Sequence, residues 1–126
     1  NELSHVFLNL INNAKDALSG KKGAKKVFIY VKTTPKEIHI SVIDNAGGIN
    51  EEILPRVFDP YFTTKHQSVG TGIGLYMSKQ IIEEHMQGTI TCKNIHHKMG
   101  SLQFYKCAMF TIIIPRNPQK ESHEPS

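Results

Sequence analysis

The sequence predicts an α+β domain, a two-layer sandwich in which helices pack on one face of a mostly antiparallel sheet. Two observations support this fold class. Apolar residues recur at helical spacing in two long segments, 2–19 and 75–86. They alternate with other residues in four shorter segments, which we expect to be strands: 27–31, 38–42, 89–95 and 108–114. Helices grouped with such strand pairs are typical of this fold, with the second sheet face solvated.

The first helix is predicted from spacing of three, four and seven between apolar residues such as Leu3, Val6 and Leu10. Glycines from Gly20 onward end it. A turn at 34–36 joins the first two strands.

Between the second strand and the second helix we expect a short helical turn in 51–58, capped by Asn50, and a mobile loop over 59–71. Gly88 is expected to stop the second helix. Residues 1–115 form the predicted domain, and residues 116–126 are expected to be a frayed tail.

Length and composition exclude several classes of protein. The chain has 126 residues, enough for one domain with a core, and a net charge of +4. No run approaches the roughly 18 apolar residues that span a bilayer, and no signal-peptide pattern is present. Because Asn1 is not an initiator Met, we expect a piece of a longer protein.

The basic, cysteine and histidine residues lack the patterns of nucleic-acid or metal sites. The lysine cluster at 21–26 has no interleaved aromatic residues, so no nucleic-acid partner is expected. Cys92 and Cys107 have no CxxC spacing and are expected to be reduced thiols. His96 and His97 are adjacent and are expected to lie in a loop.

A glycine-rich stretch stands immediately before the second helix. Glycines without a Cβ next to a helix N-terminus can offer several N–H donors to an anion. The sequence therefore predicts a phosphate-binding cradle, although many such turns bind nothing. Its residues are Gly70, Thr71, Gly72, Ile73, Gly74 and Leu75.

The first helix carries a polar stripe. Asn9, Asn13 and Asp16 are four and three residues apart and share one face. The Asn13 carbonyl oxygen would suit Mg²⁺, which takes one or two protein ligands and keeps waters and phosphate oxygens. The alternative is a set of solvent-facing polar residues.

Two further segments have both a binding and a structural interpretation. Asp44, at a strand end before a glycine-rich turn, could accept hydrogen bonds from an exocyclic amine, or could belong to a plain turn. In the segment 58–65, aromatic residues could anchor a lid and Lys65 could meet a phosphate. The alternative for that segment is core aromatics and a surface lysine.

Together these segments resemble the ATP-binding catalytic domain of sensor histidine kinases. That domain shares a superfamily with gyrase, heat-shock chaperone and mismatch-repair ATPases, and the resemblance covers about residues 1–115. The four motifs stand in the family's order, as its N, G1, F and G2 boxes: Asn9-x-x-x-Asn13, Asp44-x-Ala46-x-Gly48-Ile49, Phe58-Asp59-Pro60-Tyr61-Phe62-Thr63-Thr64-Lys65 and Gly70-x-Gly72-x-Gly74-Leu75.

The resemblance implies a role for each motif. Asn13 would hold Mg²⁺, with Asn9 and Asp16 lining the same pocket. Asp44 would read the adenine, and Ala46, Gly48 and Ile49 would shape the adenine slot. The remaining nucleotide-binding residues that it implies are Phe58, Thr64, Lys65, Gly70, Thr71, Gly72, Ile73, Gly74 and Leu75.

Three positions depart from the family pattern. Ala46 replaces a usual glycine, Cys107 stands where a glycine often precedes the last strand, and the insert 96–106 suggests a longer hairpin than usual.

The implied function is donation of the γ-phosphoryl group of Mg²⁺-ATP to a histidine, in two-component signal transduction. The acceptor would lie on an upstream dimerisation domain, so no catalytic residue is expected in this chain and 1–126 alone should not autophosphorylate. A response-regulator receiver domain is the other implied partner. The domain would be cytoplasmic, and its parent could be a homodimer anchored in the inner membrane.

The alternatives are an anti-sigma serine kinase and a catalytically degenerate interaction module; a hydrolase would need a base where Asn9 stands.

Overall fold

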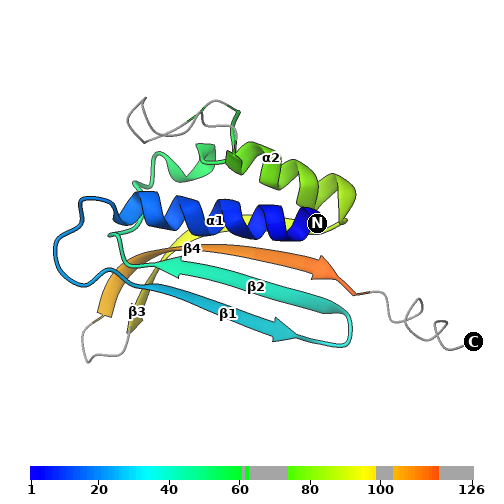
Figure 1. Ribbon diagram of the computed structural model, residues 1–126, viewed down its shortest axis with the longest axis horizontal. Helices are drawn as coiled ribbons and strands as arrows, with labels where there is room; N and C mark the ends of the chain where they lie inside the picture. The colour runs from blue at the N-terminus through cyan, green and yellow to red at the C-terminus, as the bar shows by residue number, and fades with distance from the viewer. Residues whose placement is uncertain (61, 63–73, 99–103, 117–126) are drawn as a thin grey trace, which may run out of the picture.

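Two helices cover one face of a four-stranded sheet (Figure 1), which confirms the predicted α+β sandwich. The computed structural model describes residues 1–60, 62, 74–98 and 104–116. In chain order the elements are α1 (Glu2–Leu18), β1 (Val27–Thr33), β2 (Glu37–Asp44), the 3₁₀ turn η1 (Leu54–Arg56), α2 (Gly74–Gln80), the π-helical turn η2 (Ile81–His85), β3 (Thr89–Lys98) and β4 (Phe104–Pro115).

The strands lie in the order β1-β2-β4-β3, and the three described pairings are all antiparallel. Strand β4 therefore lies between β2 and β3. Ile40, Ile112 and Ile90 are opposite one another on β2, β4 and β3. Because side chains alternate between faces along a strand, this register gives one face a continuous apolar layer.

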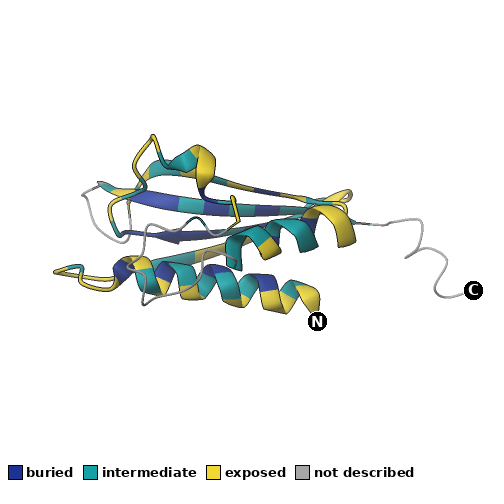
Figure 2. Cartoon of the chain, turned by 90° about the horizontal axis from the view of Figure 1, so that it is seen from above, coloured by how far each residue is buried: buried dark blue, intermediate teal, exposed yellow. Residues whose placement is uncertain are grey.

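The main core lies between that apolar layer and the helices. Val6, Leu10 and Ala14 of α1 are buried against it, as their spacing predicts. Figure 2 shows the buried positions of α1 on the side turned to the sheet. Complete burial of a Leu, Ile or Val side chain contributes about 1.5–3 kcal/mol, so this layer is the main source of stability.

The outer sheet face is not simply solvated, and the expectation that it would be was wrong in part. Ile43 and Cys107 are buried there, and four half-buried side chains pack against them. These are Phe28, Ile95, Tyr105 and Met109.

The long hairpin expected from the insert 96–106 is confirmed, and its strands β3 and β4 extend further than the predicted 89–95 and 108–114. Strand pairing continues through His96 and His97, which lie opposite Lys106 and Tyr105, so the expectation that the two histidines lie in a loop was wrong. The His97 ring packs edge-on against Phe28, at 5.6 Å between centroids. This packing stabilises His97 within β3. Local strand propensity alone does not predict that β3 extends this far.

Both cysteines are free thiols, as expected. Burial, and next the charge of Asp44, raises the pKa of Cys92 to about 12. Its thiol is therefore protonated at neutral pH and a poor nucleophile.

The helix ends show which residues set them. The Asn1 side chain accepts the Ser4 N–H at 2.9 Å and caps α1. Gln87, with φ of 53°, takes the left-handed conformation after η2, whereas Gly88 had been expected to stop this helix. The glycine at 88 serves a close approach, because a Cβ there would collide with the Ile113 backbone carbonyl.

Arg116, which was expected to belong to the frayed tail, is held to the turn between β1 and β2. Arg116 donates its backbone N–H to the Lys36 carbonyl at 2.7 Å and a guanidinium N–H to the Thr34 carbonyl at 3.0 Å. Residues 117–126 lie outside the described residues, as does nearly all of the expected loop 59–71. Within the described ranges, no helix is both long and apolar enough to cross a bilayer.

We predict that Gly88→Ala destabilises the fold, because the new methyl group meets the backbone of β4. Such overpacking costs about 1–3 kcal/mol, measurable by urea denaturation. Gly74→Ala is the control, since its Cβ would meet no described atom closer than 3.9 Å. Equal stability of the two variants would contradict this interpretation.

Candidate nucleotide-binding site

The structure describes ten of the sixteen predicted site residues. They come from α1, from the end of β2 with the loop 45–50, and from the segments on either side of the undescribed stretch. Six lie outside the described residues: Thr64, Lys65, Gly70, Thr71, Gly72 and Ile73.

The polar stripe of α1 is half-buried. Asn9, Asn13 and Asp16 are all partly covered, whereas Asn12 and Lys15 between them are exposed. The Asn9 carboxamide therefore does not simply face solvent: its Nδ2 donates to the fully buried Ser78 Oγ at 3.1 Å.

This hydrogen bond places the N-box helix beside the start of α2. The Asn9 Oδ1 would lie 3.9 Å from a Cβ built on Gly74, the last glycine of the predicted cradle. Asn9 is 69 residues from Ser78 in the sequence, so two distant motifs meet through α1 and α2.

Asp44 ends β2 and is 3% exposed. Its place at a strand end before a turn did not predict this burial. Its Oδ1 accepts the Ala46 N–H at 3.1 Å. Burial raises the pKa of the Asp44 carboxyl, and the Ala46 N–H offsets part of that rise. No ion pair involving Asp44 is present among the described residues, so an incoming donor would stabilise its charged form.

The loop that follows Asp44 is held at both ends by asparagine side chains. Asn45 accepts the Lys26 N–H at 2.9 Å and donates to the Ala24 carbonyl at 3.0 Å. Asn94 of β3 accepts the Ile49 N–H at 2.7 Å and donates to the Ile49 carbonyl at 2.6 Å.

Neither asparagine was predicted as a site residue from the sequence. Asn94 does carry a signal: it follows Ile90 and Cys92 at spacing two, so it occupies a helix-facing position that alternation assigns to an apolar residue. Asn45 has no comparable signal, because asparagine is ordinary in a turn.

Gly48 is required for two reasons. Its φ of +81° is unfavourable for other residues, and a Cβ would lie 2.9 Å from Asn94 Oδ1 and 3.0 Å from Lys106 Cε. Ala46 is different, because its φ is not positive. The departure from glycine at position 46 therefore brings no backbone strain.

Phe58 and Leu75 pack against the core on either side of the undescribed segment. The Phe58 ring meets Phe110 edge-on at 6.0 Å between centroids, and the Lys79 ammonium lies 5.3 Å from the Phe58 centroid. Phe58 thus packs in the core, as the structural alternative for segment 58–65 expects, and the expected lid lies outside the described residues.

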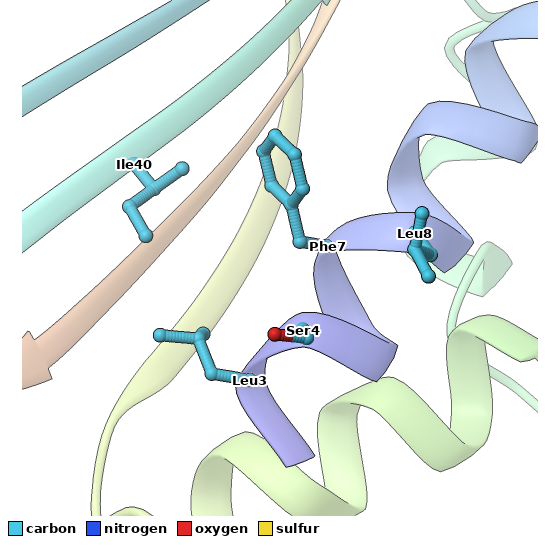
Figure 3. Close-up of a pocket in the computed structure, with 5 residues that line it drawn as sticks. All are labelled: Leu3, Ser4, Phe7, Leu8 and Ile40. Carbon is cyan, nitrogen blue, oxygen red and sulfur yellow. The ribbon is translucent and has the colours of Figure 1, made fainter. Parts of the chain in front are cut away.

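An open apolar groove at the N-terminal end of α1 is separate from these residues. Figure 3 shows Leu3 and Phe7 projecting from α1 near Ile40 of β2. Ser4 and Leu8 complete the lining, so the groove offers a nucleotide only one polar side chain. It is therefore not the predicted site.

Comparison with known proteins matches residues 1–118 to one family, described as "Histidine kinase-, DNA gyrase B-, and HSP90-like ATPase". Among curated proteins, the histidine-protein kinase AtoS of Escherichia coli is 38% identical over 93% of this chain and 17% of its own length. The sensor histidine kinase ZraS of Salmonella typhimurium is 40% identical over 90% of this chain and 22% of its own length. The chain thus spans under a quarter of these relatives.

Solved structures agree with this assignment. The catalytic domain of the histidine kinase ThkA superimposes with a TM-score of 0.70 at 27% identity, covering 93% of this chain and 69% of that one. The mycobacterial sensor histidine kinase MprB shares the fold at a TM-score of 0.69 and 20% identity, over 90% of this chain and 70% of its own. The chain therefore belongs to the family of histidine kinase-, DNA gyrase B- and HSP90-like ATPases, as an ATP-binding catalytic domain of the sensor histidine kinase type.

Proposed function

We propose that this domain binds Mg²⁺-ATP between α1, the loop 45–50 and the start of α2, and donates the γ-phosphoryl group to a histidine of an upstream dimerisation domain. The observation that carries the proposal is the buried Asp44 carboxylate, which among the described residues accepts a hydrogen bond from the Ala46 N–H alone. An exocyclic amine is the donor that would satisfy it.

The half-buried stripe of α1 supports the phosphate end of this assignment. Asn13 lies one helical turn after Asn9, which Ser78 holds beside Gly74. The Asn13 carbonyl is a hard oxygen ligand that fits Mg²⁺, and Asp16 follows on the same face. No cluster of three acidic, His or Cys side chains occurs among the described residues. A magnesium ion bound here would therefore take most of its ligands from phosphates and water.

The chemistry would be divided between this domain and its partners. Phosphoryl transfer depends mainly on positioning and charge neutralisation, so the donor domain holds the phosphates while another domain supplies the nucleophile. A receiver domain of a response regulator would then accept the phosphoryl group. The domain would act in the cytoplasm, and the parent would be a homodimer held at the inner membrane.

The first prediction is Mg²⁺-dependent ATP binding without autophosphorylation by residues 1–126. Isothermal titration with ATP, with and without Mg²⁺, measures the binding, and radiolabelled ATP measures any transfer. A failure to bind Mg²⁺-ATP would favour a degenerate interaction module. Full autophosphorylation of the domain alone would contradict the division of labour.

The second prediction concerns adenine recognition. Asp44→Asn removes a charged acceptor, so the Kd for Mg²⁺-ATP should rise roughly ten- to hundredfold, the loss expected for a buried hydrogen bond to a charged group. Glu37→Gln is a matched control, because it neutralises one exposed carboxylate at the opposite end of the same strand. An unchanged Kd for Asp44→Asn would remove the adenine assignment.

The third prediction separates binding from stability. Because burial raises the pKa of Asp44, the stability that this group contributes is present below its ordinary pKa of 3.8 and is lost as pH rises through the folded-state pKa. Asparagine does not titrate, so the stability of Asp44→Asn relative to the unsubstituted protein should rise as pH increases from 3.8 through the folded-state pKa of Asp44. Urea denaturation across this range measures the difference, and a gap that is constant with pH would contradict the prediction.

A further inference from the structure

Asn94 lies in the same row of the sheet as Asp44. In the register of the strands, Asp44 is opposite Ala108, and Ala108 is opposite Asn94. All three therefore face the helices, and the Cα atoms of Asp44 and Asn94 are two strand spacings apart, roughly 10 Å. The small, buried Ala108 between them leaves the two polar side chains on either side of one apolar position.

The Asn94 carboxamide binds both backbone groups of one residue. Its Oδ1 accepts the Ile49 N–H at 2.7 Å, and its Nδ2 donates to the Ile49 carbonyl at 2.6 Å and to Glu51 Oε2 at 2.8 Å. An antiparallel partner strand exchanges the same two kinds of bond with a residue opposite it. The Asn94 side chain thus binds the loop to β3 with the two hydrogen bonds that a neighbouring strand would otherwise make.

Gly48 makes this docking geometry specific. A Cβ at this position would lie 2.9 Å from Asn94 Oδ1, which is too close for a side chain. The backbone can therefore come this near the Asn94 amide because residue 48 is glycine. At the other end, Asn45 ties the loop to the Ala24 carbonyl and the Lys26 N–H. The position of the loop relative to Asp44 is consequently fixed by side-chain amides.

We propose that Asn94 is a positioning residue that sets selectivity for adenine over guanine nucleotides. The inference rests on the proposed function, in which Asp44 accepts from the adenine amine and Gly48 and Ile49 form the wall of the base slot. Guanine presents a carbonyl where adenine presents the amine, and two acceptors facing each other repel. This discrimination requires the loop at Gly48 and Ile49 to hold the base in one position relative to Asp44. Asn94 fixes that loop through its hydrogen bonds to Ile49.

The test compares Asn94→Ala with the unsubstituted protein by titrating each with Mg²⁺-ATP and Mg²⁺-GTP. The Kd for ATP should rise about tenfold, with a smaller change for GTP, so that the ATP-to-GTP preference falls. Ser41→Ala is the matched control: it removes a part-buried hydrogen bond, to Thr111 at 3.1 Å, on the opposite face of the same sheet. It should lower the melting temperature without changing the preference.

The double variant Asp44→Asn/Asn94→Ala completes the test. If Asn94 acts by positioning the base against Asp44, the two effects on ATP affinity are less than additive. An unchanged ATP-to-GTP preference in Asn94→Ala, or strictly additive effects, would overturn the proposal. Absence of Mg²⁺-ATP binding by the unsubstituted protein would instead refute the proposed function, so the two failures are distinguishable.

Discussion

The candidate site depends on a carboxylate that the fold buries without a cationic partner in the described part of the chain. Asp44 ends a strand whose preceding inward residues, Ile40 and Val42, belong to the core. The sheet therefore places the carboxyl group where burial removes it from water. Among the described residues, the Ala46 N–H alone offsets the free-energy cost of burying its charge. A natural fold tolerates such a cost at a functional position, where a ligand supplies the missing donor.

The residues that stabilise the fold differ from those expected to bind the ligand. The apolar layer between α1 and the sheet stabilises the domain, and none of its fully buried members is a predicted site residue. The polar contacts join elements that are distant in sequence: Asn9 with Ser78, and Ile49 with Asn94. Substitutions in these contacts should therefore affect ligand recognition more than folding.

Much of the fold follows from the sequence because it is encoded by local periodicity. The spacing of Val6, Leu10 and Ala14 defines one helix, and the alternation in β2 fixes which side chains face it. The insert 96–106 indicated a long hairpin, but the continuation of strand pairing into it was not predictable, because its support comes from contacts across strands, such as His97 with Phe28. Neither the strand propensity of single residues nor the alternation of apolar residues predicts those contacts.

The site was predictable in part, for a similar reason. Motif spacing singled out Asp44 and Asn9 as candidates, since each stands in a fixed pattern with its neighbours, and their role in binding stays a prediction. Asn94 and Ser78 hold those motifs through single side chains from other elements, and only the three-dimensional structure brings them together. The burial of Asp44 was also missed, because a strand-end position in sequence gives no information about the helices and loops that cover it.

The pKa of Asp44, followed by NMR from the chemical shift of its carboxyl carbon, tests the central claim most directly. In the free domain, burial should hold this pKa above its ordinary value of 3.8. Saturating Mg²⁺-ATP should lower it, because an amine that donates to the carboxylate favours the charged form. A pKa that stays the same in the presence of saturating Mg²⁺-ATP would contradict the assignment of Asp44 as the adenine-binding residue.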